Sequence, residues 1–144
     1  MNHVKAARER VRPPSIRVRV DSDRAIVEAR QRGRALAERA GFGLTDLAII
    51  ATAISELARN ALQYAKWGDI VVRCVEDGDR MGVLVMATDA GPGIPNITQA
   101  LQDGYSSSGS LGLGLPGVKR LMDEFEISSE LGHGTTVIAK KWRL

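Results

Sequence analysis

The spacing of apolar residues changes from one segment of the chain to the next and predicts an order of elements. Apolar and basic residues alternate over residues 15–20, a pattern typical of a half-buried strand. Apolar residues then recur every three or four positions over 26–40 and 47–61, which predicts two amphipathic helices. The pair Asp21-Ser22 and the residue Thr45 stand where the N-caps of these helices are expected.

The second half of the chain carries strand signals around strong turn residues. Asp77-Gly78-Asp79 separates two apolar runs and predicts a hairpin. The second run is nearly all apolar, so we expect it at the centre of a sheet. The expected boundaries are strands at 69–76, 81–88, 125–129 and 135–142, with a short helix at about 114–123.

Helices and strands mix here without regular βαβ alternation, and the sequence has no internal repeat. These features favour an α+β fold, a two-layer sandwich with helices on one face of a mostly antiparallel sheet. We expect a single domain over residues 15–144, preceded by a flexible basic tail at residues 1–14 for which the sequence indicates no role.

Composition and charge narrow the class of protein. The net charge is +3, but the first 20 residues carry six basic side chains against Glu9 alone, so the rest of the chain is slightly acidic. Basicity in a tail and only six aromatic residues do not predict a nucleic-acid surface. Residues 1–12 lack the apolar core of a secretory signal, and no apolar run is long enough to span a membrane. With Cys74 as the only cysteine, we expect a cytoplasmic protein.

Glu56 and Asn60 lie four residues apart on the second helix and project from the same side of it, opposite the apolar stripe. In isolation such a pair is typical of a solvated helix face. An Asn amide oxygen is nevertheless a suitable ligand for Mg²⁺, and a nearby carboxylate can serve as a general base.

A second candidate element, Asp89-Ala-Gly-Pro-Gly93, follows the apolar strand. A carboxylate at a strand end, followed by glycines that let the backbone approach a flat ligand, can accept a hydrogen bond from an exocyclic amine such as that of adenine. The alternative is a plain turn in which Asp89 accepts from its own backbone.

The third element is the glycine-rich run Gly109-Ser-Leu-Gly112-Leu-Gly114-Leu-Pro-Gly117, which opens a helix and predicts a phosphate cradle rather than a flexible loop. Gly112-x-Gly114-x-x-Gly117 also matches a dinucleotide-binding fingerprint, but no strand precedes it. A Walker A sequence is absent, as is the His-Arg-Asp catalytic loop of the large protein kinases.

Glu-x-x-x-Asn on a helix, Asp-x-Gly-x-Gly after a strand, Gly-x-x-Gly-x-Gly into a helix, and Gly-x-Gly-Thr before the last strand occur here in this order. From about residue 15 to its end, the chain resembles the GHKL (Bergerat-fold) ATP-binding family that includes gyrase, Hsp90, histidine kinases and MutL. The resemblance implies ATP and Mg²⁺ as cofactors, with Asn60 on the metal and Asp89 on the adenine amino group.

The resemblance also assigns roles to the remaining motif residues. Gly91 and Gly93 would shape the adenine pocket, and Thr135 would support the adenine side through water. The phosphates would be lined by three glycines, Gly109, Gly112 and Gly114. Residues 96–111 would form a mobile lid. Lys119 and Arg120 are candidates for the γ-phosphate only because they are near this run in sequence.

Features that the chain lacks exclude several branches of this family. Gyrase, Hsp90 and MutL need further domains, and a histidine kinase needs a phosphoacceptor histidine on a dimerisation helix, whereas the only histidines here are His3 and His133. Three stretches resemble the small serine kinases and anti-sigma factors of bacterial partner-switching systems, and among these the RsbT-type switch kinases; the stretches are 51–60, 89–95 and 112–125.

The resemblance implies a protein-serine/threonine kinase that transfers the ATP γ-phosphate to a STAS-domain antagonist or scaffold protein of a stressosome-like complex. On release, such a kinase binds and activates a PP2C-type phosphatase. In this mechanism Glu56 would accept the proton of the incoming hydroxyl. The alternative is an anti-sigma factor that binds sigma or its antagonist in an ATP-dependent manner, because the same pocket serves both functions.

Overall fold

The structure is a computed structural model that describes residues 9–102 and 114–143 of the chain. Its strands form one five-stranded sheet in the order β1-β2-β3-β5-β4, and every neighbouring pair is antiparallel. The elements in chain order are β1 (Glu9–Val20), α2 (Asp23–Arg39), α3 (Leu44–Ala65), β2 (Gly68–Asp77), β3 (Arg80–Asp89), α4 (Ile97–Ala100), α5 (Gly114–Leu121), β4 (Glu124–Glu130) and β5 (Gly134–Trp142).

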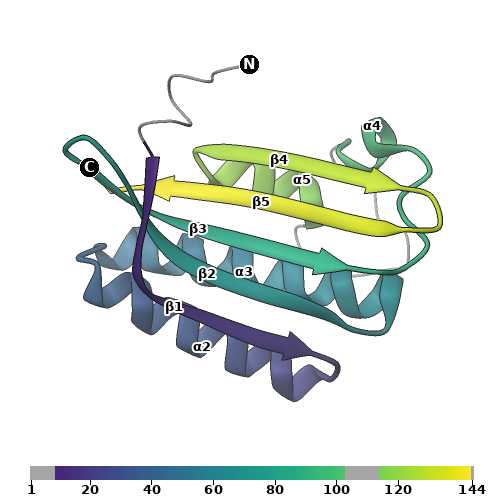
Figure 1. Ribbon diagram of the computed structural model, residues 1–144, viewed down its shortest axis with the longest axis horizontal. Helices are drawn as coiled ribbons and strands as arrows, with labels where there is room; N and C mark the ends of the chain where they lie inside the picture. Colours follow the sequence, from purple (N-terminus) through teal and green to yellow (C-terminus); the bar gives the residue numbers. More distant parts are fainter. Residues whose placement is uncertain (1–8, 103–113, 144) are drawn as a thin grey trace.

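Helices α2, α3 and α5 cover the same face of the sheet, with α3 behind its centre, α2 behind β1 and α5 behind β4 and β5 (Figure 1). This arrangement confirms the predicted two-layer α+β sandwich. The nearly all-apolar strand, β3, lies between β2 and β5, as its sequence predicts. Gly78, with φ of +61°, and Asp79 close the hairpin between β2 and β3.

The start of α2 follows the predicted capping chemistry. The Ser22 hydroxyl accepts a hydrogen bond from the N–H of Ala25 at 3.2 Å, which satisfies one of the free donors at the start of the helix. At the other end Gly41 has φ of +92° and donates to Glu38, while Phe42 donates to Ala37. This is a Schellman ending, and glycine adopts its left-handed position without strain.

The predicted cap of α3 is wrong. Gly43, rather than Thr45, is the N-cap, and its carbonyl accepts from Leu47 N at 2.9 Å. Helix α3 therefore begins one residue before Thr45, and its first turn has no side-chain cap. Helix α4 was also not predicted, because its single turn lies within a segment dominated by glycine and proline.

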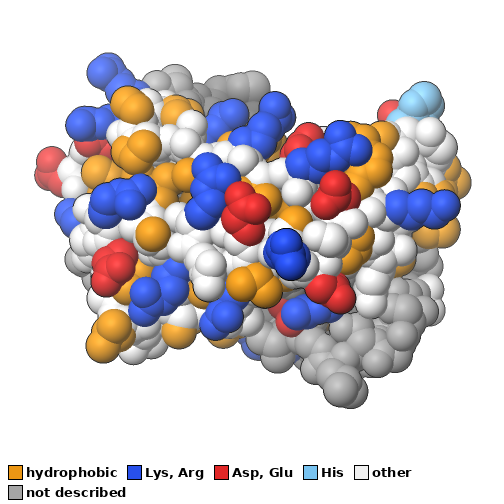
Figure 2. All heavy atoms as spheres, turned by 90° about the horizontal axis from the view of Figure 1, so that it is seen from below, with side chains coloured by type: hydrophobic (Ala, Val, Ile, Leu, Met, Phe, Trp, Pro, Cys, Tyr) orange, Lys and Arg blue, Asp and Glu red, His pale blue; other side chains and the backbone are white. Residues whose placement is uncertain are grey.

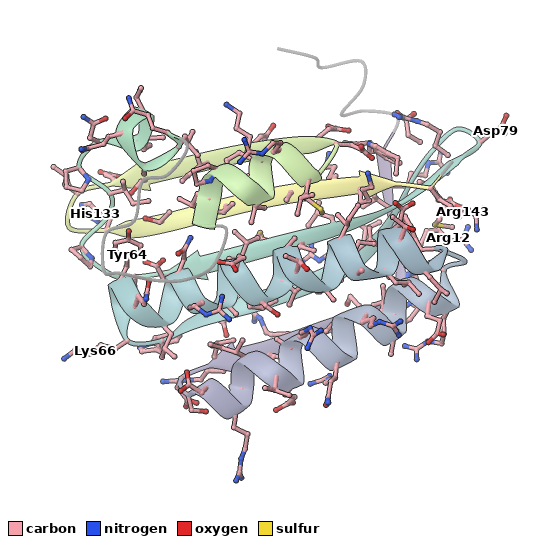
Figure 3. The ribbon with its side chains drawn as sticks, turned by 180° about the vertical axis from the view of Figure 1, so that it is seen from behind. Arg12, Tyr64, Lys66, Asp79, His133 and Arg143 are labelled. Atoms are coloured by element: carbon pink, nitrogen blue, oxygen red, sulfur yellow. The ribbon has the colours of Figure 1, made fainter. Side chains whose placement is uncertain are left out.

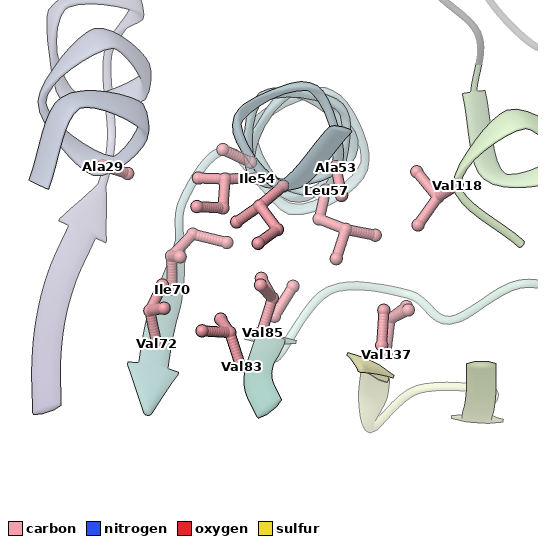
Figure 4. Packing of buried hydrophobic residues seen from close by; sticks show 14 of the residues in the cluster. Ala29, Ala53, Ile54, Leu57, Ile70, Val72, Val83, Val85, Val118 and Val137 are labelled. Carbon is pink, nitrogen blue, oxygen red and sulfur yellow. The ribbon is translucent and has the colours of Figure 1, made fainter. Parts of the chain in front are cut away.

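The core lies between the sheet and α3. Ile54 and Leu57 point from α3 toward the valines of the central strands, and Val118 of α5 approaches from the side (Figure 4). Ile54 is fully buried and Leu57 is 1% exposed. Full burial of an aliphatic side chain contributes roughly 1.5–3 kcal/mol to folding, so this layer holds α3, and the residues it carries, in a fixed position on the sheet.

Strand β1 begins at Glu9, six residues before the predicted start, so residues 9–14 are not part of a tail. Residues 9–12 pair with residues 74–77 of β2, and the pairing register shifts at Pro13-Pro14. Prolines are tolerated at such irregularities of an edge strand. Both carboxylate oxygens of Glu9 also accept from Lys140 on β5, at 2.7 and 2.8 Å.

Charged side chains of both signs intersperse with apolar ones on the side of the molecule seen in Figure 2. Several pair along a helix or across strands, such as Arg32 with Glu28 at 3.1 Å and Arg12 with Glu76 at 2.9 Å. None of the helices in the described ranges combines the length and the apolar character that crossing a bilayer requires.

Candidate functional site

A pocket opens between the C-terminal half of α3 and the adjoining ends of β3 and β5. The empty space between its walls is about 320 Å³ when the part open to solvent is included. Three of the sequence-predicted side chains converge on it from three elements: Asn60 from α3, Asp89 from the end of β3, and Thr135 from the start of β5. The rest of the lining is apolar or aromatic, namely Leu57, Ala61, Tyr64, Ala87, Ile94, Leu115 and Val137.

The location of the pocket can be followed in Figure 3. Tyr64, which lines it, and His133, in the turn before β5, lie at one end of the molecule, whereas Asp79 at the hairpin tip lies at the opposite end. Largely apolar walls with a few convergent polar groups are typical of small-molecule sites.

Asp89 and Thr135 face each other as direct partners of the β3–β5 ladder. The close approach of the two strands depends on Gly134, whose φ is +116° and where a Cβ would overlap the carbonyl oxygen of Asp89. Thr135 is 8% exposed, and its hydroxyl shares a 2.8 Å hydrogen bond with the hydroxyl of Ser129 on β4. The Ser129 hydroxyl also accepts from Ile94 N at 2.6 Å, so it joins β4 and β5 to the segment after β3.

The Asp89–Gly93 turn packs closely against the end of α3. Asp89 Oδ1 accepts from Gly91 N at 2.9 Å, the local bond expected for a turn. A Cβ on Gly91 would lie 2.6 Å from the Cβ of Ala65, and one on Gly93 would lie 2.6 Å from the Glu130 carbonyl oxygen. Gly93 also has φ of +82°. Both glycines therefore permit a turn that a larger residue would push out of place.

Glu56 does not lie on a solvated helix face. It is 6% exposed, and the start of α5 lies against it. Its Oε1 accepts from Gly114 N at 3.2 Å, and its Oε2 accepts from Arg59 Nη1 at 3.0 Å. The N–H of Gly114, which the resemblance assigns to a phosphate, thus contacts the carboxylate that the sequence suggests as a base.

The glycine run is described only in part. Gly109 and Gly112 lie outside the described residues, and Gly114, with φ of +65°, begins α5. Of the predicted lid, residues 96–102 are described and contain α4, which Asn96 caps through a 2.9 Å bond from Gln99 N. Lys119 and Arg120, the candidate phosphate contacts, are exposed in the last turn of α5.

The sequence did not single out two polar residues near the pocket. Ser129 gave no signal, because its role depends on two contacts that come from other strands and turns. Arg59 could have been recognised by its position three residues after Glu56 on the same helix.

Cys74 belongs to the core, where burial raises the pKa of its thiol, with smaller opposing contributions from Arg39 and Arg12.

We expect Gly134→Ala to destabilise the protein by about 2–4 kcal/mol, because the added methyl group combines a strained φ with overlap of Asp89. The matched control is Gly132→Ala, where φ is +81° but a Cβ meets no atom within 4 Å. Thermal unfolding should show a fall in Tm of about 10 °C for Gly134→Ala and a clearly smaller fall for Gly132→Ala. Equal falls would contradict the proposed close approach.

The donor set of the pocket fits a purine nucleotide. Apolar walls suit a flat base, and a carboxylate at the strand end suits an amino group. Asn60 lines the same pocket, and its neutral amide oxygen is a ligand that Mg²⁺ accepts when phosphate oxygens supply the charge.

Comparison with known proteins agrees with this chemistry. Residues 3–141 match the family model of the histidine kinase-like ATPase domain. The chain is 53% identical over 125 residues to the serine/threonine-protein kinase RsbT of Bacillus subtilis, covering 87% of this chain and 94% of that protein. It is 35% identical over 97 residues to the anti-sigma F factor of Clostridium beijerinckii, covering 64% of this chain and 68% of that factor.

A solved structure, that of the RsbU and RsbW domains of a Mycobacterium tuberculosis protein, superposes with a TM-score of 0.58 at 26% identity. The match covers 91% of this chain and 33% of that one. The family model spans nearly the whole chain, and the similarity to RsbT extends over most of both proteins. The chain therefore belongs to the histidine kinase-like (GHKL) ATPase family and, within it, to the RsbT-type serine/threonine kinases.

Proposed function

We propose that this protein is a cytoplasmic switch kinase that transfers the ATP γ-phosphate to a serine or threonine of a STAS-domain antagonist or scaffold protein in a stressosome-like complex. On release from that complex, it binds and activates a PP2C-type phosphatase. The observation that carries the proposal is the convergence of Asn60, Asp89 and Thr135 on one pocket, in a chain 53% identical to RsbT.

Different residues of the site bind different parts of the nucleotide. The carboxylate of Asp89 accepts a hydrogen bond from the adenine amino group, and Thr135 holds a water on the same side of the base. Gly91 and Gly93 keep the turn close to α3, so that the base can lie against the apolar wall. The amide oxygen of Asn60 would hold Mg²⁺, and the phosphates would be bound by the glycine run of Gly109, Gly112 and Gly114, of which only Gly114 is among the described residues.

When bound, Mg-ATP supplies the phosphoryl group and the positive charge that offsets its negative oxygens. Glu56 accepts the proton that the incoming hydroxyl loses as its oxygen bonds to the γ-phosphorus. In the same step the bond between that phosphorus and the bridging oxygen breaks, and ADP leaves with the electron pair. Burial of Glu56 at 6% exposure keeps bulk water away from the carboxylate that takes this proton.

A second candidate function is that of an anti-sigma factor, favoured by the 35% identity to the Clostridium beijerinckii protein. In that case ATP sets the affinity for a sigma factor or its antagonist, and phosphoryl transfer is secondary. The same pocket serves both functions, so the fold does not discriminate between them.

The deciding experiment mixes the full chain with Mg-ATP and a STAS-domain protein taken from the same genome. Mass spectrometry then looks for phosphoserine or phosphothreonine on the partner, with ADP formation measured in parallel. We expect one phosphate per STAS protein and an equal amount of ADP. Absence of phosphate, together with co-purification of a sigma factor, would replace the kinase by the anti-sigma function.

A further inference from the structure

The carboxylate of Glu56 is a nearly buried charge, and such a charge is costly unless it is paired and hydrogen-bonded. Its two oxygens meet donors from different sides. Oε1 accepts from the backbone N–H of Gly114 at the start of α5, 58 residues away in sequence. Oε2 accepts from Arg59 Nη1, which lies three residues further along α3.

These two contacts differ in strength and in exposure. The bond from Arg59, at 3.0 Å, joins two opposite charges, whereas the bond from Gly114, at 3.2 Å, comes from a neutral amide. Charge-assisted hydrogen bonds are roughly twice as strong as neutral ones. The side chain of Glu56 is 8% exposed and that of Arg59 is 39% exposed, so water screens the guanidinium in part but hardly reaches the carboxylate. Of these two contacts, the one from Arg59 is the stronger.

Orientation matters for a general base, because the carboxylate must come within about 2.6–3.2 Å of the hydroxyl whose proton it accepts. Each carboxylate oxygen has two lone-pair directions. The donors from Arg59 and Gly114 constrain the plane of the Glu56 carboxylate. Loss of the Arg59 bond removes one of the contacts that restrict the terminal torsion of Glu56, and such torsions are broad in side chains.

We propose that Arg59 is a positioning residue of the phosphoryl-transfer site, which holds the Glu56 carboxylate in the orientation that accepts the hydroxyl proton and keeps it against Gly114. This inference rests on the proposed function in one respect, namely that Glu56 takes the proton. Arg59 also immediately precedes Asn60, so one turn of α3 carries the base, the residue that orients it and the proposed metal ligand.

Lysine should replace arginine only in part. Lysine keeps the charge but offers a compact ammonium on a flexible stem, whereas the planar guanidinium presents donors in a fixed geometry that matches a carboxylate. Methionine has a similar unbranched stem and no charge, so Arg59→Met removes the ion pair while it preserves the packing along α3.

The test compares Arg59→Met, Arg59→Lys and Glu56→Gln with the wild-type chain. We expect Arg59→Met to lower kcat for transfer to the STAS protein about 10- to 100-fold, since misorientation of a catalytic group has effects of this size. The ATP dissociation constant should stay within about twofold, because Arg59 acts on the base and not on the nucleotide. Arg59→Lys should recover part of the lost kcat. In the double variant that combines Glu56→Gln with Arg59→Met, kcat should be little lower than in Glu56→Gln alone, because the two residues act as a unit.

A second readout does not depend on phosphoryl transfer. In NMR spectra of the full chain, Arg59→Met should shift the Gly114 amide proton toward its position in Glu56→Gln and raise its hydrogen-exchange rate roughly tenfold. The matched control is Arg32→Met, which breaks an ion pair of the same kind between Arg32 and Glu28 on α2. That control should leave both kcat and the Gly114 amide unchanged.

The outcomes separate the two proposals. If the wild-type chain transfers no phosphate, the proposed function fails, and the Gly114 amide alone decides whether Arg59 positions Glu56. If Arg59→Met leaves kcat and the Gly114 amide as in the wild type, Arg59 has no positioning role. Loss of ATP affinity in parallel with kcat would make Arg59 a nucleotide ligand instead. If Arg59→Met fails to fold, the comparison of Arg59→Lys with the wild type applies the same criteria.

Discussion

Asn60→Ala should abolish Mg-ATP-dependent phosphoryl transfer, with a fall in kcat of about 10³-fold or more, while the protein keeps its fold. Asn60 is only partly buried and lies in the interior of α3, where alanine has the highest helix propensity, so the helix should not weaken. What the variant loses is the amide group of a residue that lines the pocket. Without it, Mg²⁺ lacks its protein ligand and the phosphates lose their alignment for transfer.

The measurement is a single-turnover transfer assay with radiolabelled ATP over a range of Mg²⁺ concentrations, with far-UV circular dichroism as the check of folding. Gln63→Ala is the matched control, because it removes an amide from an exposed position of the same helix. Gln63→Ala should transfer phosphate at the wild-type rate. Normal transfer by a folded Asn60→Ala variant would show that the metal is held elsewhere.

Asp89→Asn should weaken ATP binding about 10- to 100-fold and reduce the preference for ATP over GTP. Asp89 Oδ1 accepts from Gly91 N, and an asparagine keeps one oxygen for that bond, so the turn should persist. The other carboxylate oxygen becomes an NH₂ group, which cannot accept from the adenine amino group. Loss of a charge-assisted hydrogen bond costs roughly 1.5–3 kcal/mol, which corresponds to this change in affinity.

The same substitution turns an acceptor into a donor, which suits the carbonyl oxygen that guanine carries at that position. Isothermal titration with ATP and GTP should therefore show the ratio of their affinities falling at least tenfold. Asp77→Asn, at the end of β2, is the control, because this carboxylate lies at the opposite end of the hairpin strands and pairs with Arg80. If Asp89→Asn binds ATP as the wild type does, Asp89 supports the turn only.

Much of the fold could be predicted because its signals are local. The period of apolar residues located α2, α3 and the four strands from β2 onward, and Gly78 marked the hairpin. The errors concern features that leave no signal in the nearby sequence. Residues 9–12 are held in β1 by pairing with β2, and the cap of α3 is a glycine without a side-chain signal.

The candidate site was predictable as a set of residues but not as an arrangement. Motif order identified Asn60, Asp89 and Thr135, and the structure brings these three to one pocket. The helical period of the apolar residues placed Glu56 on the side of α3 opposite the apolar stripe. That placement is correct for the helix considered by itself. The period could not reveal that the start of α5 contacts Glu56, because α5 comes from a distant part of the chain.

The sequence by itself determined the order of the motifs, the family they resemble and the chemistry of each side chain, since these depend on residue type and spacing along one strand or helix. Only the tertiary structure decided that Asp89 pairs with Thr135 across two strands and that Ser129 ties them to the following turn. It also decided that Glu56 is buried between Arg59 and Gly114. Apart from the bonds of Glu56 with Arg59 and of Ser129 with Thr135, these contacts join residues far apart in the chain, which strand pairing and the packing of α5 on α3 bring together.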